Sequence, residues 1–465
     1  MRMKYKSIII VVGVVIISSF HSYRDSEQKL NGVWSSVGYG KQMIINDSIV
    51  TLYDTYSGGC ALFSVIPQRV FGNISEILNL THNSLKLKVG LTVYEFTRVN
   101  SNISPCNTKH IKNDPLSNFD ALWNTFNENY SSFDLRHIDW NKMKERYRPM
   151  LTTQSSDYEL YSVLNQMISE LNDGHVFLEA PDSIKEKLDR AFDNRIGNLR
   201  KRVVSQITSK YLDEVHNYNK GNIIWGVING NIGYIQINNF EDLANYNVSD
   251  SLSEEEFWET YWKAAENSSN YTKDVLVSLN RLMGIIIEDF KTTKFCIIDV
   301  RFNSGGFDQA GLDVLSFFTN KRILAYTKKA RSGKGYARKQ AVYLNPAPIN
   351  YSNPVYILTS YQTASASETF VLGSLNLPKV RRIGSNTAGV FSDILDKRLP
   401  NGWKYGLSNE IYESEDSINY EVAGINPDYK IYYKKDGFSF YKQLINEIDT
   451  GDIALEKAME LGKSQ

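Results

Sequence analysis

The chain has 465 residues, of which 42% are hydrophobic and 22% are charged, and these values are typical of an ordinary globular protein. They exclude long disordered or fibrous segments, and the length predicts several domains of about 100–200 residues each. The 52 basic residues balance the 52 acidic ones, which excludes binding of nucleic acid through bulk electrostatics. The chain has three cysteines and neither a Cys-x-x-Cys nor a His-Glu-x-x-His pattern, so we expect no metal and no other cofactor.

The N-terminus has the pattern of an export signal. Basic residues at positions 2, 4 and 6 precede an apolar run over residues 8–17. A basic start followed by about 7–15 apolar residues is typical of a secretory signal, whereas a membrane-spanning helix needs about 20. We therefore expect residues 1–22 to be a signal peptide or, alternatively, an N-terminal membrane anchor, and the protein to be periplasmic or extracellular. A buried N-terminal strand is the remaining alternative.

The three cysteines fall into two groups. Export would place Cys60 and Cys106 in an oxidising compartment where they can form one disulfide, and two separate thiols fit the sequence equally well. Cys296 lies in the apolar run 295–298, which predicts a buried core residue.

The hydrophobic pattern changes twice along the chain. Residues 28–104 alternate between apolar and polar side chains with Gly and Asn breaks, which predicts a small antiparallel β domain. Residues 114–222 carry apolar side chains at helical spacing and end in a charged helical stretch, so we expect a helical cap.

The rest of the chain has an α/β pattern. Between residues 223 and 440, apolar strands are followed by Gly or Ser turns and helical patterns, which predicts a mixed sheet with crossover helices. Residues 441–465 are expected to form a C-terminal helix. The clearest predicted strands of the α/β core cover residues 232–237, 295–300 and 355–358.

Three positions carry residue types suited to catalysis. His175 follows a helical block at a Gly turn, and the near-neutral pKa of an imidazole suits a general base. Gly305 and Gly306 follow a buried strand and allow a sharp turn with outward amides, which can hold a developing oxyanion. Ser365 opens a helix after a strand, where the helix dipole stabilises negative charge.

Each of these positions also has a purely structural interpretation. The histidine can be a solvated loop residue, the two glycines a plain tight turn, and Ser365 with Glu368 a helix capping box. The structural interpretation is the stronger one for each position alone. Their occurrence together favours catalysis.

In chain order these positions resemble the motif blocks of the S41 serine peptidases. That family includes the tail-specific (C-terminal processing) proteases and the tricorn core protease. The resemblance extends from about residue 119 to 430, and the predicted β domain lies outside it. The matching blocks are residues 171–175, 232–235, 299–306, 365–368, 384–389 and 424–428.

The resemblance implies a ClpP/crotonase-like core fold and a set of roles. Ser365 matches the family nucleophile, and the amides of Ala366 and of the turn at Gly305 and Gly306 would form the oxyanion hole. His175 matches the histidine of tricorn-type members, and Glu421 matches their glutamate.

Lysine-type members of the family instead carry a lysine just after the Thr-x-Gly turn. This chain has Val390 at that position, and Lys397 lies several residues too late. The resemblance therefore implies the tricorn type.

Two features depart from the family pattern. A serine precedes the histidine in tricorn-type members, and Gly174 stands there in this chain. The group that orients His175 is therefore open, with Asp173 or a water as candidates, and Glu421 has a surface strand carboxylate as its alternative. Only residues 179–231 separate the histidine block from the next strand, too few for the PDZ domain that many members insert.

A basic run over residues 328–339 is a candidate substrate-binding element. It contains Arg331 and Lys334, which would attract the carboxylate of a peptide C-terminus. A solvated hairpin is the alternative interpretation.

We therefore predict an exported serine endopeptidase that hydrolyses peptide bonds in unfolded proteins or short peptides. Membrane contact is expected only through the N-terminal anchor, and the oligomeric state is left open. One alternative is a non-catalytic protein that binds apolar ligands or peptides on the same fold. The other is a crotonase-like thioester enzyme, which export disfavours because coenzyme A is cytoplasmic.

Overall fold

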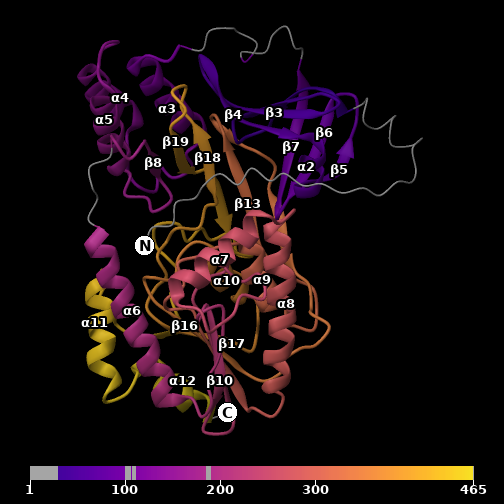
Figure 1. The fold of residues 1–465 in the computed structure, drawn as a ribbon, viewed down its shortest axis with the longest axis vertical. Coiled ribbons are helices and arrows are strands. Elements are labelled where there is room, and N and C mark those ends of the chain that lie inside the picture. The colour runs from indigo at the N-terminus through magenta and orange to yellow at the C-terminus, as the bar shows by residue number, and fades with distance from the viewer. Residues whose placement is uncertain (1–29, 100–105, 107–111, 185–189, 464–465) are drawn as a thin grey trace.

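The computed structural model describes residues 30–99, 106, 112–184 and 190–463, so the predicted signal peptide lies outside the described residues. Figure 1 shows three parts, with a β domain and a helical cap at the top and an α/β core below. The predicted α/β fold class with an N-terminal antiparallel β domain is confirmed. Among the described helices, none combines the length and the apolar character needed to cross a membrane.

The β domain is one seven-stranded antiparallel sheet with the order β4-β3-β2-β1-β7-β6-β5. Trp34 is fully buried at the centre of its apolar cluster. A short helix, α2 (Gln68–Ile74), joins the two edge strands β4 and β5. The strands are β1 (Gly32–Ser36), β2 (Lys41–Ile45), β3 (Ile49–Tyr56), β4 (Gly59–Pro67), β5 (Glu76–Leu80), β6 (Ser84–Val89) and β7 (Thr92–Val99).

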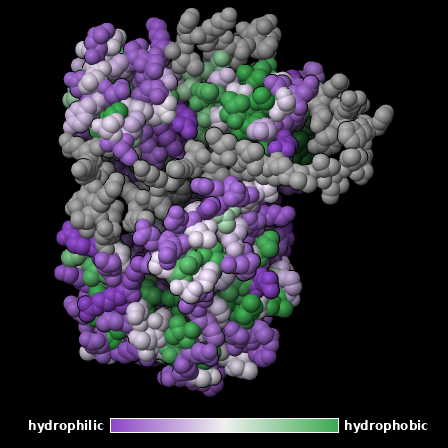
Figure 2. Space-filling view, viewed as in Figure 1, coloured by the Kyte–Doolittle hydropathy of each residue, from purple (hydrophilic) through white to green (hydrophobic). Residues whose placement is uncertain are grey.

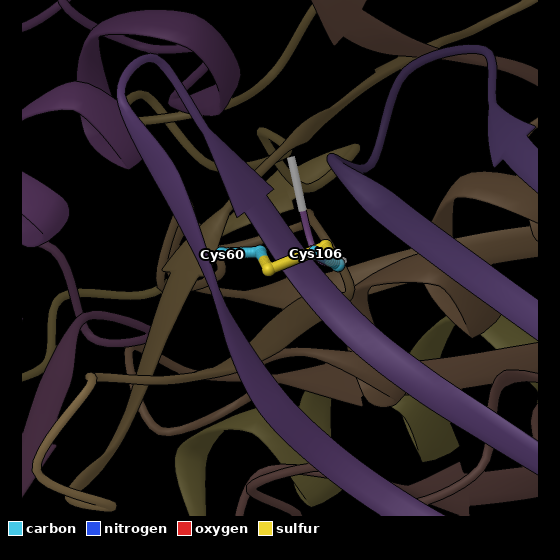
Figure 3. Close-up of a disulfide and its surroundings, with 2 residues drawn as sticks. All are labelled: Cys60 and Cys106. Atoms are coloured by element: carbon cyan, nitrogen blue, oxygen red, sulfur yellow. A yellow bond between two sulfur atoms is a disulfide. The ribbon is translucent and has the colours of Figure 1, made fainter. Parts of the chain in front are cut away.

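The structure pairs Cys60 of β4 with Cys106 in a disulfide, as Figure 3 shows. The bond ties the β domain to the segment that leads into the cap. Cys296 is buried and free in the core, as its apolar surroundings predict. On the face in Figure 2, hydrophobic side chains gather over the β domain, whose edge strand β4 exposes Leu62 and Val65.

The helical cap is built around aromatic side chains. Phe119, Leu122 and Phe126 recur at helical spacing, are fully buried, and pack in one apolar cluster with Trp140. The cap helices are α3 (Pro115–Asn129), α4 (Trp140–Tyr147), the 3₁₀ turn η3 (Arg148–Met150) and α5 (Asp157–Ser169).

The cap also contains strands that we assigned to the core. β8 (Phe177–Glu179) pairs with β19 (Lys404–Ser408), which pairs with β18 (Ile394–Arg398). Tyr405 and Leu407 of β19 are fully buried in the aromatic cluster of the cap. Residues distant in sequence thus complete the cap, which local periodicity does not reveal.

The core is a seven-stranded mixed sheet with the order β21-β17-β16-β12-β11-β10-β9. The strands from β11 to β21 pair in parallel, and β9 and β10 add antiparallel pairs at one edge. The strands are β9 (His216–Tyr218), β10 (Ile223–Ile228), β11 (Ile232–Ile237), β12 (Phe295–Asp299), β16 (Val355–Thr359), β17 (Val380–Gly384) and β21 (Tyr429–Lys430).

Helices cover both faces of this sheet, which explains its almost continuously apolar strands. Ile298 of β12 belongs to the apolar cluster on one face, and its neighbour Ile297 belongs to the cluster on the other. The first face packs against α7 (Glu254–Glu266), α8 (Tyr271–Asp289), α9 (Asp308–Ser316) and α10 (Ala366–Ser374). The second face packs against α6 (Arg190–Tyr211), α11 (Gly437–Ile448) and α12 (Ile453–Lys463).

Two of the predicted boundaries differ from the structure. We expected α6 in the cap, but its Val203 and Ile207 are fully buried against the C-terminal helices on the core sheet. The expected single C-terminal helix is two helices, α11 and α12, because Gly451 adopts a φ of 146° between them.

A smaller sheet connects the three parts. Its strands are β13 (Ile323–Ser332), β14 (Gly335–Tyr336), β15 (Gln340–Leu344) and β20 (Glu410–Glu413), and β13 lies at its centre. Figure 1 shows β13 running from the core toward the β domain and the cap.

Candidate active site

Ser365 occupies a strained turn between β16 and α10. Its backbone has a φ of 56° and a ψ of −126°, a conformation that residues other than glycine rarely adopt. Its side chain caps no amide of α10, and its own amide donates to the carbonyl of Val390 at 3.1 Å. The turn thus leaves the hydroxyl without a structural role at the helix N-terminus.

The capping-box interpretation of this turn is wrong. The Glu368 carboxylate turns away from Ser365 and accepts the amides of Gly389 and Val390 at 2.7 and 2.6 Å. Burial raises the pKa of this carboxyl to about 8. Glu368 therefore fixes a neighbouring loop against α10 instead of closing the end of the helix.

The glycine turn approaches Ser365 closely. Gly305 and Gly306 have φ values of 123° and 130°, and a Cβ on Gly305 would lie 2.7 Å from the Cβ of Ser365. A Cβ on Gly306 would lie 2.5 Å from the carbonyl carbon of Phe240. Only glycine fits either position.

The backbone amides around this turn differ in whether they already donate a hydrogen bond. The Gly305 amide donates to the Oδ1 of Asn303 at 2.8 Å, which corrects its expected place in the oxyanion hole. Within the described part of the chain, the amides of Gly306 and Ala366 donate to no other group. Gly305 thus supplies space beside Ser365, and the other two amides remain free to bind an oxyanion.

Hydrogen bonds hold the glycine turn and the serine turn together. The strands that precede them, β12 and β16, are parallel neighbours, so both turns lie at the same edge of the sheet. The carbonyl of Asn303 accepts the amide of Ala364 at 3.2 Å and the Ser367 hydroxyl at 2.7 Å. The hydroxyl of Ser360 donates to the Arg301 carbonyl at 2.6 Å. Sheet topology and these bonds fix the two turns relative to each other.

His175 lies at the end of the cap. Its amide donates to the Oδ1 of Asp173 at 2.9 Å, which closes a tight turn after α5. The residue is 8% exposed, and Nδ1 of its imidazole is buried without a hydrogen-bond partner in the described part of the chain. Burial lowers the pKa of His175, which outweighs the opposing effects of Asp173 and the Ser392 backbone. The imidazole is therefore neutral at pH 7, as a general base requires.

The segment 389–393 links the histidine to the serine. The Val390 carbonyl accepts the amide of Ser365, and the Ser392 backbone opposes the fall in the pKa of His175 that burial causes. A Cβ on Gly174 would lie 3.6 Å from both γ-methyl groups of Val390. The segment thus contacts both the serine turn and the histidine turn, which are far apart in the sequence.

Glu421 contacts this same segment. Its Oε2 accepts the Phe391 amide at 2.8 Å, and its Oε1 lies 3.2 Å from Nη2 of Arg136. Burial and the nearby carboxylate of Asp173 raise the pKa of Glu421 to about 7. Glu421 is thus a buried group with several partners, which contradicts the alternative of a surface carboxylate.

Asp173 and Arg136 connect Glu421 with the histidine turn. Nη2 of Arg136 also lies 3.5 Å from Oδ2 of Asp173, which in turn holds the backbone of His175. The Tyr130 hydroxyl donates to the same Oδ2 at 2.8 Å. Sequence reasoning named Asp173 but missed Arg136 and Tyr130, because no local motif marks residues that the fold brings together.

The other candidate residues lie elsewhere. The Arg331 guanidinium donates to the carbonyls of Tyr130 and Asn127 at 2.6 and 3.1 Å, so it caps the end of α3 and is not free to bind a peptide carboxylate. Lys334 is exposed in the β13–β14 turn. Lys397 is fully buried and donates to the Tyr39 carbonyl of the β domain at 2.6 Å. Its ammonium therefore serves the junction with the β domain.

Comparisons with known proteins identify the family. Residues 231–431 match the model of peptidase family S41, and residues 111–169 match that of the tricorn protease C1 domain. Among solved structures, the chain is similar to a Parabacteroides merdae ATCC 43184 protein assigned as a peptidase (23% identity, TM-score 0.53, 73% of this chain and 100% of that one). It is also similar to mature CPAF complexed with lactacystin (9% identity, TM-score 0.51, 76% of this chain and 99% of that one). At these identities the likeness shows a shared fold.

The fold and the matched models define a serine peptidase of the processing-protease kind. Residues 231–431 form a domain of peptidase family S41, and residues 111–169 of the cap match the tricorn protease C1 domain. The chain is thus an enzyme, not the non-catalytic binding protein that the sequence left as an alternative. The described residues between β8 and β11 form α6, β9 and β10, in the interval where many family members insert a PDZ domain.

Proposed function

We propose that this peptidase cleaves peptide bonds in unfolded proteins or short peptides outside the cytoplasm, with Ser365 as the nucleophile and His175 as the base. One observation carries the proposal. Ser365, in a strained turn and free of any capping role, lies beside the unoccupied amide of Ala366 and shares the segment 389–393 with a neutral, buried histidine.

The chemistry follows from these positions. Ser365 attacks the scissile carbonyl while His175 takes its proton, which it later gives to the leaving amine. The amides of Gly306 and Ala366 stabilise the oxyanion of the tetrahedral intermediate, and loss of one such donor costs about 10²–10³-fold in rate. Glu421 acts at a distance, through Arg136 and the histidine turn.

The location of the two side chains supports an extended substrate. His175 belongs to the cap and Ser365 to the core, so a cleavable bond must enter between the two parts. A folded domain is too thick to present its backbone there, whereas an unfolded chain or a short peptide presents it directly. Export is supported by the basic and apolar N-terminal pattern and by the pairing of Cys60 with Cys106.

The roles of serine and histidine are tested by substitution. We expect Ser365→Ala and His175→Ala each to reduce cleavage of an unstructured fluorogenic peptide by at least about 10⁴-fold, with unchanged folding by circular dichroism. Ser251→Ala and His82→Ala are matched controls on the surface and should keep full activity. A serine-reactive phosphonate should label the wild-type enzyme at Ser365.

Three results would contradict the proposal. Activity in both site variants would exclude the assigned pair. Inactivation by Lys397→Ala alone, in a folded protein, would instead favour the lysine-type mechanism. The proposed export would be contradicted if cell fractionation finds the native protein in the cytoplasm and N-terminal sequencing shows that it retains Met1.

A further inference from the structure

The N-terminal β domain is bonded to the catalytic parts through buried polar contacts. The Gln340 side chain of β15 pairs with the backbone of Val93, accepting its amide at 2.8 Å and donating to its carbonyl at 2.9 Å. The Arg398 amide of β18 donates to buried Asp54 at 2.7 Å. This junction is specific, so the β domain is fixed against the active-site sheets and is not a loosely tethered module.

A buried ion pair lies at the centre of this junction. Nζ of Lys328 on β13 lies 3.0 Å from Oε2 of Glu410 on β20, and the two side chains are 0% and 3% exposed. The β domain completes their hydrogen bonds. The Tyr39 hydroxyl donates to Oε1 of Glu410 at 2.6 Å, and the Thr92 hydroxyl accepts from Lys328 at 2.6 Å. The Tyr412 hydroxyl is a further partner of both charges.

The ion pair is also in contact with the segment 389–393, which packs against the histidine turn. The Glu410 amide donates to the hydroxyl of Ser392 at 2.9 Å, and Nζ of Lys328 lies 3.4 Å from Oδ2 of Asp393. The same segment packs against the histidine turn, because a Cβ on Gly174 would lie 3.6 Å from both γ-methyl groups of Val390. A chain of contacts therefore runs from the β domain to the turn that carries His175.

We propose that the β domain is a working part of the active site, in which Tyr39 and Thr92 are positioning residues. Through Lys328 and Glu410 they hold residues 392–393, and hence His175, in place. A buried ion pair is favourable only when its remaining donors and acceptors are satisfied, and it is costly when one is left unpaired. Without the Tyr39 hydroxyl, Glu410 must move to find a partner, and Ser392 moves with it. This inference rests on the proposed role of His175 as the base.

The test removes single hydroxyls from the β domain. Tyr39→Phe and Thr92→Val keep the shape of each side chain, and we expect kcat to fall by about 5- to 50-fold with KM nearly unchanged, because a misplaced base slows chemistry more than binding. Labelling of Ser365 by the phosphonate should slow by a similar factor. Tyr53→Phe is the matched control in the same domain, because the Tyr53 hydroxyl makes no hydrogen bond in the described part of the chain.

A double-mutant cycle separates positioning from general destabilisation. In an enzyme carrying Lys328→Met and Glu410→Gln, the charges are gone and Tyr39→Phe should cause no further loss of kcat. The proposal is overturned if Tyr39→Phe lowers only the melting temperature and leaves kcat unchanged in the folded enzyme. An equal loss of kcat with and without the ion pair overturns it as well.

The Ser365→Ala variant distinguishes the two proposals. An inactive Ser365→Ala enzyme together with a fully active Tyr39→Phe enzyme refutes only the positioning role of the β domain. An active Ser365→Ala enzyme refutes the proposed mechanism itself.

Discussion

The nucleophile side and the base side of this active site are built in different ways. On the nucleophile side, two adjacent parallel strands end together, and backbone groups and hydroxyls bond the Gly305 turn to the Ser365 turn. On the base side, His175 from the cap is held near Arg136 and Glu421 by charged side chains from separate parts of the chain. Catalysis therefore depends on geometry at the nucleophile side, whereas at the base side it also depends on the protonation of the charged groups.

The largest effect is expected from a change of geometry on the nucleophile side. We expect Gly305→Ala to lower kcat/KM by about 10²–10³-fold, because the added Cβ would collide with Ser365 and displace the neighbouring oxyanion amide. The loss should be independent of pH. Gly197→Ala, where a Cβ meets open space, is the control. If steady-state kinetics found the Gly305→Ala enzyme unimpaired, the close packing of the two turns would not matter for catalysis.

A smaller and pH-dependent effect is expected on the base side. Burial and, to a smaller extent, the positive charge of Arg136 lower the pKa of His175, so Arg136→Gln should raise this pKa and move the acid limb of the kcat/KM profile to higher pH. Activity near pH 8 should be largely retained. Arg202→Gln on the exposed face of α6 is the control. An acid limb that stays at the same pH would show that the charge of Arg136 does not affect the pKa of His175.

The smallest effect concerns stability. Burial, with a contribution from Asp173, raises the folded-state pKa of Glu421 from its ordinary 4.5 to about 7, so the folded protein holds a proton that the unfolded chain has lost between these values. The stabilising contribution of protonated Glu421 is present in full below pH 4.5 and is lost as the pH rises through 7.

In the wild type, the free energy of unfolding should therefore change by up to about 3 kcal/mol between pH 5 and 8 through the titration of Glu421. The variant Glu421→Gln should lack this change. Urea unfolding at several pH values measures this, with exposed Glu415→Gln as the control. A Glu421→Gln curve parallel to that of the wild type would show that Glu421 ionises normally in the fold.

Much of the nucleophile side could be predicted from the sequence. A buried strand followed by Gly305-Gly306, and another followed by Ser365 and a helix, are local patterns, and parallel strands bring such turns to one edge. The sequence could not show that the Gly305 amide is taken by Asn303, or that Glu368 turns toward Gly389 and Val390. Those outcomes depend on which polar groups the folded chain leaves within reach.

The base side and the junction with the β domain were much less predictable. The basic run at 328–339 indicated a substrate-binding or solvated hairpin, yet Lys328 is buried against Glu410 and Arg331 caps α3. The local sequence does not distinguish a solvent-exposed lysine from one that is buried in an ion pair. Its environment is decided by β20, which lies more than 70 residues further along the chain.

Residues close together in the chain set the apolar periods of the strands and helices, the glycine turns and the chemical types available for catalysis. Which of those groups meet depends on how the parts of the chain pack together. Contacts among Tyr39, Lys328, Glu410 and Ser392 join segments separated by hundreds of residues, and burial there fixes both the hydrogen bonds and the charge states. Local sequence cannot encode such contacts, because their energies depend on desolvation that exists only once the parts have packed.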